Sequence, residues 1–295
     1  MTIYRFEFKA MASSSEIVVA ADARNIAESV ARQAVEEVSR IEKKYSRYHP
    51  DTIVSRINAA AGGDPVPYDE ETGSLLGYAD ALYETSGGLF DITSGVLRRA
   101  WDFSKASVPD PDLLRPLLDL IGWEKVERRD NTVRLTLAGM QLDFGGFGKE
   151  YAADRAAAVL HMQGIRYGYV NLGGDIRVIG PKPGGEPWMI GIQDPRQKNR
   201  TVASIPLYTG ALTTSGDYER YFVTGGRRYC HVINPRTGYP VTYWQSVTVL
   251  AQSAFTAGSR STIAMLKEGE GLAFLEKNGL KYMAIDSLGE MYYRN

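Results

Sequence analysis

The sequence predicts an α+β fold, built mostly from antiparallel or mixed β-sheets with packed helices, in two closely packed halves around a cleft. Strands greatly outnumber the helices that might serve as parallel crossovers, and several neighbouring strands are separated by turns of only a few residues. Glycine supplies 30 of 295 residues, above the usual share of roughly 7%, and clusters between elements. No repeat, low-complexity tract or linker divides the chain, so we expect residues 1–295 to form a single domain.

Hydrophobic periodicity predicts the elements of the first half. Alternating residues indicate strands at 3–9 and 15–21. Apolar residues three and four positions apart then indicate a helix from Ile26 to Tyr45, which ends before Pro50 because proline disfavours helix in the residue that precedes it. The same reasoning predicts helices at 69–86, 112–120 and 148–163, and a hairpin of strands at 123–128 and 132–138.

The second half is richer in strands. The run 181–185 is expected to be a surface turn, at the tip of a hairpin. Two helices are expected at about 256–267 and 269–278, and a final hairpin at 281–286 and 290–293. The other predicted strands cover 167–172, 175–180, 188–193, 201–206, 220–224, 228–233 and 245–251.

The charge and residue counts exclude several classes of function. With 34 Lys+Arg against 35 Asp+Glu, the chain has no broad basic field for nucleic acid or an anionic membrane surface. One cysteine and three scattered histidines exclude sulfur-ligated or histidine-ligated metal clusters, so any metal should be hard and bound by oxygen. No apolar run approaches the roughly 18 residues of a membrane helix. The sequence predicts a cytoplasmic protein, although a mature extracytoplasmic chain without its leader would look the same.

Four segments combine glycine, small hydroxyl residues and charged groups. Paired glycines let backbone N–H groups approach a ligand closely, and a helix N-terminus adds partial positive charge, which together suit phosphate. In the second segment Glu150 follows Lys149, where a P-loop would carry Ser or Thr, so a Walker motif is excluded. The segments are SGGLFDITSG (86–95), LDFGGFGKEYAAD (142–154), NLGGD (171–175), and TTSGDYERYF (213–222) with HVINPRTGYP (231–240).

Taken in chain order, these segments resemble the ApbE family, the FAD:protein FMN transferases. The resemblance covers roughly residues 5–285 and includes SRYHPDTIVSRIN, GGLFDITSGVLRRAWDF, VNLGGDI and SVTVLAQSAFTAGSRSTIAML. It implies an enzyme that cleaves the diphosphate of FAD with a divalent metal and attaches FMN to a threonine or serine hydroxyl of a partner flavoprotein, releasing AMP.

The family pattern also implies which residues bind FAD. Tyr48 and Phe90 are suited to flank a ring system, with a purely core role as the alternative interpretation of Phe90. Asp91 lies between two apolar residues and would otherwise need a buried partner. Lys149 is either a phosphate or flavin contact or a solvated side chain at a helix start. The implied FAD contacts are Met11, Tyr48, Leu89, Phe90, Asp91, Asp143, Lys149 and Val232, with Thr214, Ser215 and Gly216 on the nucleotide side of the pocket.

His231 and Arg236 are the candidate catalytic residues. His231 precedes a rigid turn, residues 234–238, that we expect to aim both side chains at the diphosphate. A neutral imidazole can take the proton of the attacking hydroxyl, and a guanidinium can hold phosphate oxygens bidentately. A histidine that only satisfies a neighbouring carbonyl is the alternative interpretation.

The expected metal site departs from the family pattern. The resemblance implies Mg²⁺ held by a backbone carbonyl of the glycine-rich turn, here Gly146, and by an Asp and a Thr four residues apart on one helix. The threonine corresponds to Thr262, with Ser261 beside it, but Gly258 stands where the Asp is expected, and Arg260 adds a nearby cation. Asp175 or Asp217 is a candidate substitute for the carboxylate, and Arg260 is a candidate for neutralising the diphosphate directly.

The sequence thus leads to one principal hypothesis and two alternatives. The principal one is an FMN transferase that acts on a partner flavoprotein and has no nucleic-acid partner and no transmembrane segment. The first alternative is an FAD-binding homologue in which Gly258 has weakened or abolished transfer. The second is an FAD diphosphate hydrolase, in which water takes the place of the acceptor hydroxyl.

Overall fold

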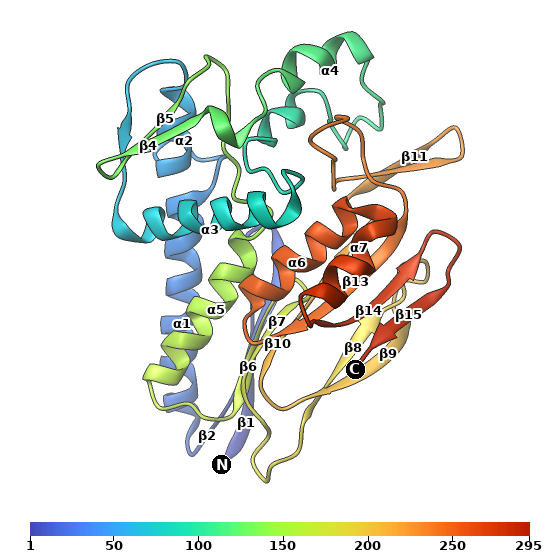
Figure 1. The fold of residues 1–295 in the computed structure, drawn as a ribbon. Helices are drawn as coiled ribbons and strands as arrows, with labels where there is room; N and C mark the ends of the chain where they lie inside the picture. The colour runs from blue at the N-terminus through green and yellow to red at the C-terminus, as the bar shows by residue number, and fades with distance from the viewer.

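The computed structural model describes all 295 residues, and its centre is an eight-stranded sheet in which every neighbouring pair of strands is antiparallel (Figure 1). The strand order is β1-β2-β6-β7-β10-β13-β14-β15, so strands from both halves of the sequence share one sheet. The strands are β1 (Thr2–Ala10), β2 (Ser13–Ala21), β6 (Gly168–Leu172), β7 (Asp175–Gly180), β10 (Gly210–Gly216), β13 (Trp244–Ala251), β14 (Lys281–Asp286) and β15 (Met291–Arg294).

Three helices cover one face of this sheet: α1 (Arg24–Tyr45), α5 (Gly148–Met162) and α6 (Ala254–Leu266) (Figure 1). Ile17 of β2, Val170 of β6 and Val247 of β13 point toward these helices and belong to the main hydrophobic core. Alternate residues of a strand point to opposite faces, so each strand contributes every second side chain to this core.

A small second sheet, β8 (Trp188–Gln193) with β9 (Thr201–Leu207), covers the other face. Val18, which follows Ile17, packs there with Tyr169, Val178 and Trp188 in a separate core cluster. The central strands of the large sheet are therefore buried on both faces, with helices on one side and strands on the other.

Most of the remaining elements lie beyond the ends of the sheet strands, whereas α7 (Gly271–Lys277) packs beside α6 and against β14 (Figure 1). Short 3-10 helices occur at Gly95–Arg99, Trp123–Lys125 and Glu268–Glu270. The other elements are α2 (Ile53–Ala59), α3 (Glu70–Ser86), α4 (Pro111–Leu118), a sheet of β3 (Val66–Pro67), β5 (Thr132–Leu135) and β4 (Val126–Arg129), and a hairpin of β11 (Tyr221–Thr224) and β12 (Arg227–Cys230).

The predicted α+β class with mostly antiparallel sheets is confirmed, and most predicted elements agree with the structure to within a few residues. Three local predictions were wrong. Strand β10 was missed because its Thr-Thr-Ser-Gly sequence resembles a turn, and α2 was missed because it is short. Residues 181–185 do form a turn, but β7 and β8 belong to different sheets, so it is not a hairpin tip. No helix is long and apolar enough to cross a membrane.

Candidate functional site

The glycine-rich turn before α5 is held in place by Asp143 and Arg47. Asp143 Oδ1 accepts a hydrogen bond from the backbone N–H of Gly145 at 2.8 Å, and Oδ2 pairs with Arg47 Nη1 at 2.8 Å. Arg47 also donates to the carbonyl of Gly95 at 3.0 Å. The predicted FAD contact Asp143 therefore orders the turn and ties it to the 86–95 segment.

Phe90 and Gly146 form a close contact between these two segments. A Cβ atom at position 146 would lie 2.8 Å from the Phe90 Cζ atom, so only glycine allows the turn to approach the ring. The Phe90 ring also stacks on Phe147, with a centroid separation of 6.2 Å, and is buried in the main core. Phe90 thus shapes the floor of the glycine-rich turn from within the core.

Asp91 has the buried partners that the sequence alone did not reveal. Its Oδ1 accepts hydrogen bonds from the backbone N–H and the hydroxyl of Thr93, at 2.8 and 2.6 Å. Its Oδ2 accepts from the backbone N–H of Trp123 at 3.1 Å. Burial raises the pKa of this carboxyl. These contacts account for a buried acid without a ligand.

Lys149 lies near the tip of the β1–β2 hairpin, where Met11 adopts a left-handed backbone conformation. The Lys149 Nζ pairs with Asp175 Oδ2 at 2.7 Å and approaches the Gly173 turn between β6 and β7. Burial alone would lower the pKa of Lys149, but the charges of Asp175 and Glu150 outweigh burial and raise it. A permanently charged ammonium group therefore stands beside the hairpin tip.

His231 is largely buried among cations. Burial, followed by the charges of Arg98 and Arg220, lowers its pKa to about 4, so the imidazole is neutral at pH 7. Lys149 contributes to the same electrostatic effect. The Nδ1 atom is buried without a hydrogen-bond partner, while the backbone N–H donates to the carbonyl of Arg220 at 3.0 Å. The Arg220 carbonyl also lies close to the imidazole and opposes the decrease in its pKa.

Arg236 points to a different place than expected. Its guanidinium donates to the carbonyl of Gly87, and the side chain lines a cavity of about 520 Å³ with Gly88 and Glu124. The 234–238 turn is closed by a hydrogen bond from the N–H of Gly238 to the carbonyl of Asn234, at 2.9 Å. The cations whose charges act most on His231 are Arg98, Arg220 and Lys149, whereas the Arg236 guanidinium binds the Gly87 carbonyl.

The hydroxyl residues of β10 separate onto two faces of the sheet. The Thr214 hydroxyl pairs with that of Thr248 at 2.9 Å, on the face covered by β8 and β9. The Ser215 hydroxyl lies on the helix face, 2.7 Å from the Ser261 hydroxyl and 3.0 Å from the Thr262 hydroxyl of α6. Strand alternation therefore brings Ser215, and not Thr214, to the predicted metal residues.

Around Gly258, α6 faces the first turn of α5. The Ser261 hydroxyl donates to the carbonyl of Gly258 at 2.9 Å. Glu150 of α5 is only 8% exposed and directs its side chain at Gly258, and its Oε2 atom has no hydrogen-bond partner. Burial, followed by the charge of Asp175, raises the pKa of Glu150 to about 8.

The acidic candidates for the missing carboxylate bind other residues, while Arg260 points toward α7 and has a buried Nη1 atom without a hydrogen-bond partner. Both oxygens of Asp217 bind Arg196, at 2.6 and 2.7 Å. Asp175 pairs with Lys149, as described above. The Arg260 guanidinium lies over the ring of Phe274 in α7, 5.8 Å from its centroid. The helix thus directs Arg260 toward α7.

Of the remaining predicted contacts, Tyr48 is 77% exposed and the Arg47 guanidinium lies 5.7 Å from its ring centroid. Leu89 is partly buried against the main core, and Val232 is buried in it. Gly216 ends β10 directly before Asp217. None of these positions contacts the Gly258 region through a hydrogen bond in the structure.

Four residues that bear on the site were not singled out as functional from the sequence. Arg47, Arg98 and Arg220 lie within the quoted segments SRYHPDTIVSRIN, GGLFDITSGVLRRAWDF and TTSGDYERYF, so their presence in segments that resemble the family was the available signal. Glu150 was noted only because it excludes a P-loop. Its orientation toward Gly258 depends on how α5 packs against α6.

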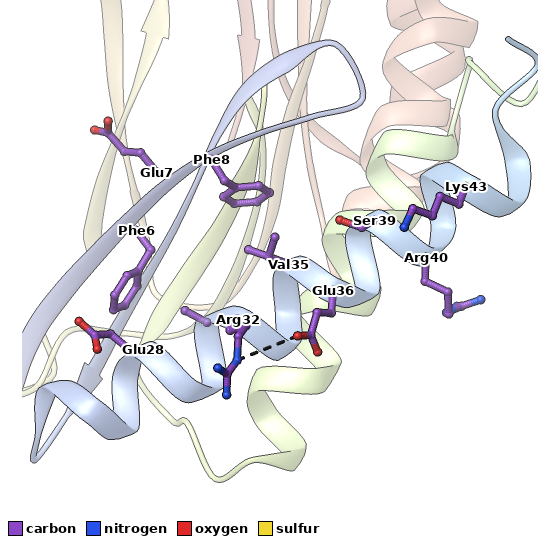
Figure 2. Close-up of a pocket in the computed structure, with 11 residues that line it drawn as sticks. Phe6, Glu7, Phe8, Glu28, Arg32, Val35, Glu36, Ser39, Arg40 and Lys43 are labelled. Carbon is purple, nitrogen blue, oxygen red and sulfur yellow. Dashed lines mark ion pairs between the residues drawn. The ribbon is translucent and has the colours of Figure 1, made fainter. Parts of the chain in front are cut away.

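A separate groove of about 700 Å³ lies between β1 and α1, lined by Phe6, Phe8 and Val35 and bordered by charged side chains (Figure 2). An Arg32–Glu36 ion pair of 4.0 Å spans part of its helical wall. None of its lining residues belongs to the four glycine and hydroxyl segments. We therefore assign the candidate site to the region around His231, Lys149 and Gly258.

Comparison with known proteins places this geometry in a family. A family model described as the ApbE family matches residues 11–284. The FAD:protein FMN transferase of Treponema pallidum is 34% identical over 274 residues, covering 81% of this chain and 75% of that protein. That of Vibrio cholerae is 32% identical over 253 residues, covering 83% and 75%.

Solved structures agree with the sequence comparison. The crystal structure of the ApbE protein from Thermotoga maritima superposes with a TM-score of 0.92 at 33% identity, over 100% of this chain and 97% of that one. The flavin transferase ApbE from Vibrio cholerae gives a TM-score of 0.87 at 26% identity, with the same coverage. Since both the sequence match and the fold extend over nearly the whole chain, the protein belongs to the ApbE family.

Proposed function

We propose that this protein transfers FMN from FAD to a threonine or serine hydroxyl of a partner flavoprotein and releases AMP. The observation that carries the proposal is the arrangement around His231, where a neutral, buried imidazole with an unpartnered Nδ1 is surrounded by Arg98, Arg220 and Lys149. The names of the curated relatives, FAD:protein FMN transferase, support the same reaction.

The cations near His231 suit the diphosphate of FAD. Guanidinium and ammonium groups bind phosphate oxygens through charge-assisted hydrogen bonds, and burial strengthens the attraction because the local dielectric is low. Burial lowers the pKa of Arg98, and no hydrogen bond from its guanidinium to another residue is found in the structure. A dianionic ligand would therefore relieve the mutual repulsion of these cations.

His231 is the proposed base. The acceptor hydroxyl oxygen attacks the phosphorus of the FMN half, and a new P–O bond forms as the P–O bond to the AMP phosphate breaks. The hydroxyl proton passes to the imidazole, and the bonding electrons leave with AMP. Such transfers depend mainly on positioning and charge neutralisation, so the residues around the phosphates carry most of the catalysis.

No group of three or more His, Cys, Asp or Glu side chains is placed to hold an ion. The hydroxyls of Ser215, Ser261 and Thr262 lie together where α6 meets β10, and the unpartnered Glu150 carboxyl faces the same helix at Gly258. These oxygen donors, with the Gly146 carbonyl as a further proposed ligand, suit Mg²⁺. When bound, such a cation would neutralise charge on the diphosphate and the leaving AMP.

At the flavin end, the exposed ring of Tyr48 is available to stack on a flat heterocycle. Met11, at the hairpin tip near Lys149, is proposed to contact the same ligand. The backbone N–H of Met11 is bound to Glu42 Oε1 at 3.0 Å, which holds the tip in position.

The test is incubation of the protein with FAD, Mg²⁺ and a flavoprotein domain that has a Thr/Ser flavinylation site. We expect the acceptor mass to increase by one FMN and AMP to appear in equal amount, with loss of both in EDTA. An authentic transferase serves as the positive control. If that enzyme modifies several acceptors and this protein modifies none, the proposal is wrong.

Chromatography of FAD incubated without acceptor distinguishes the alternatives. Continuous, multiple-turnover release of FMN and AMP in the absence of acceptor would identify a hydrolase. Tight FAD binding with neither product would identify a binding homologue.

A further inference from the structure

At the interface between α6 and α5, the Glu150 side chain fills the space where a side chain at position 258 would lie. A Cβ atom at Gly258 would lie 2.5 Å from both Cγ and Oε1 of Glu150, and 2.8 Å from its Cδ. The absence of a side chain on α6 is therefore what allows the Glu150 carboxylate to enter. The place beside Gly258 contains a carboxylate, but it comes from the neighbouring helix.

The face of α5 that carries Glu150 points toward α6. Asp154, one turn later, accepts hydrogen bonds from the backbone N–H groups of Ala254 and Phe255, at 2.9 and 2.8 Å, and so caps the start of α6. Asp154 also pairs with Arg177 at 3.1 Å. Since residues four apart share a helix face, Glu150 is held in the same direction but without equivalent donors.

The Glu150 carboxylate lacks the partners that a buried acid normally has. It is more than nine-tenths buried, and its Oε2 atom accepts no hydrogen bond. A buried acid without a partner is either protonated, as the raised pKa of Glu150 indicates for the protein alone, or charged and bound to a cation. The adjacent Lys149 does not supply this partner directly, because its Nζ lies 2.7 Å from Asp175.

Other oxygen atoms gather at the same turn of α6. The Ser261 hydroxyl donates to the Gly258 carbonyl at 2.9 Å, and Ser215 bridges Ser261 and Thr262 from the central strand β10. Carboxylate, hydroxyl and carbonyl oxygens are the donors that hard divalent cations prefer. The charged groups that face Glu150 are Asp175 and Lys149 from one side and Asp154 along the helix.

We propose that Glu150 supplies the carboxylate ligand of a divalent cation, reaching from α5 into the space that Gly258 leaves open on α6. The inference rests on the proposed function, because that function calls for a cation at this helix. The sequence-based expectation was that Gly258 leaves the site without an acidic ligand. The proposal is instead that the acidic ligand comes from α5 and not from α6.

The experiment measures cation binding directly, by titrating the full-length protein with Mn²⁺ and following free Mn²⁺ by electron paramagnetic resonance. Glu150→Gln keeps the size of the side chain and removes its charge, so we expect Mn²⁺ affinity to fall at least tenfold. Glu219→Gln is the matched control. Glu219 is an exposed acid that also acts on Lys149, and we expect less than a twofold change.

A relocation variant separates loss of the ligand from damage to the fold. Glu150→Gly combined with Gly258→Asp returns the carboxylate to α6 and removes the side chain that would collide with it. We expect Mn²⁺ affinity within threefold of the unmodified protein, and well above that of the single variant Glu150→Gly. Circular dichroism and thermal unfolding of each variant check that the fold is retained.

The outcomes are distinct. Unchanged Mn²⁺ affinity in a folded Glu150→Gln variant overturns the inference and identifies Glu150 as a protonated core acid. Absence of saturable Mn²⁺ binding in the unmodified protein, with or without FAD, also overturns it. FMN transfer is measured separately, so Glu150-dependent Mn²⁺ binding without transfer to any acceptor would leave the inference standing and reject the proposed function.

Discussion

The close approach of Glu150 to Gly258 makes a quantitative prediction about stability. In the unmodified protein, Gly258→Ala places a methyl group 2.5 Å from Cγ and Oε1 of Glu150, which the buried side chain must move to accommodate. In a Glu150→Ala background the same methyl group meets none of these atoms. The effect of one substitution should therefore depend on the presence of the other.

Two opposing contributions determine how much Gly258→Ala changes the free energy of unfolding. Overpacking a filled interior costs about 1–3 kcal/mol. Alanine, on the other hand, favours a helix interior over glycine by about 1 kcal/mol. We expect Gly258→Ala to lower the free energy of unfolding by about 1 kcal/mol in the unmodified protein and to raise it by about 1 kcal/mol in the Glu150→Ala background, a coupling of about 2 kcal/mol.

The assay is urea unfolding of the four proteins of this double-mutant cycle at pH 7.5 in EDTA, followed by circular dichroism, with thermal unfolding as an independent check. EDTA keeps cation binding from contributing to stability. If Gly258→Ala shifts the unfolding free energy equally in both backgrounds, Glu150 does not occupy the space beside Gly258 and the reasoning is refuted.

Three further predictions concern the residues around the proposed phosphate site. Because the pKa of His231 is about 4 in the folded protein and 6.5 for an unperturbed histidine, the unfolded state binds more protons between these pH values, and stability falls as pH falls. Lowering the pH from 7.5 to 5 should cost about 2 kcal/mol more in the unmodified protein than in His231→Gln, measured by urea unfolding. Arg98→Met should raise the pKa of His231, measured by NMR of the imidazole protons, because the variant loses a buried cation. For the same reason it should weaken FAD binding at least tenfold, measured by calorimetry. Ser215→Ala should lower FMN transfer at least tenfold while Thr214→Val lowers it less than threefold, since only the Ser215 hydroxyl faces α6.

Each of these predictions has a contrary result. An equal pH dependence in the unmodified protein and His231→Gln would mean that folding does not change the pKa of His231, so neither burial nor the nearby cations lower it. Unchanged FAD affinity in Arg98→Met would place the diphosphate elsewhere. Comparable losses in Ser215→Ala and Thr214→Val would contradict the assignment of the two hydroxyls to opposite faces of the sheet.

The hydrophobic patterning was sufficient to predict most helices and strands, but it failed where sequence and context conflict. Strand β10 reads as a turn because Thr213, Thr214 and Ser215 are polar, yet it pairs with β7 and β13 at the centre of the sheet. The hydroxyls of Thr214 and Ser215 bind neighbours on β13 and α6, which no local pattern reveals. Tertiary hydrogen bonds thus overrode the local turn signal.

The candidate site was likewise predictable from the sequence only in part. The ordered motifs identified the family, and they contain nearly all of the residues that line the site. The interpretation of Asp91 as a ligand contact depended on its having no protein partner, but Thr93 and Trp123 supply that partner in the structure. The sequence indicates that Asp91 is buried, whereas only the packed structure shows which groups bind its carboxylate.

By itself, the sequence determined the α+β class, most of the elements, the family and the requirement that any metal be held by oxygen. These properties follow from local periodicity, composition and motif order, which each segment carries independently. Only the tertiary structure decided that Glu150 fills the space beside Gly258 and that Arg98 and Arg220, rather than Arg236, surround His231. Such contacts join segments distant in the chain, and they arise from the packing of α5 against α6 and of loops against the sheet.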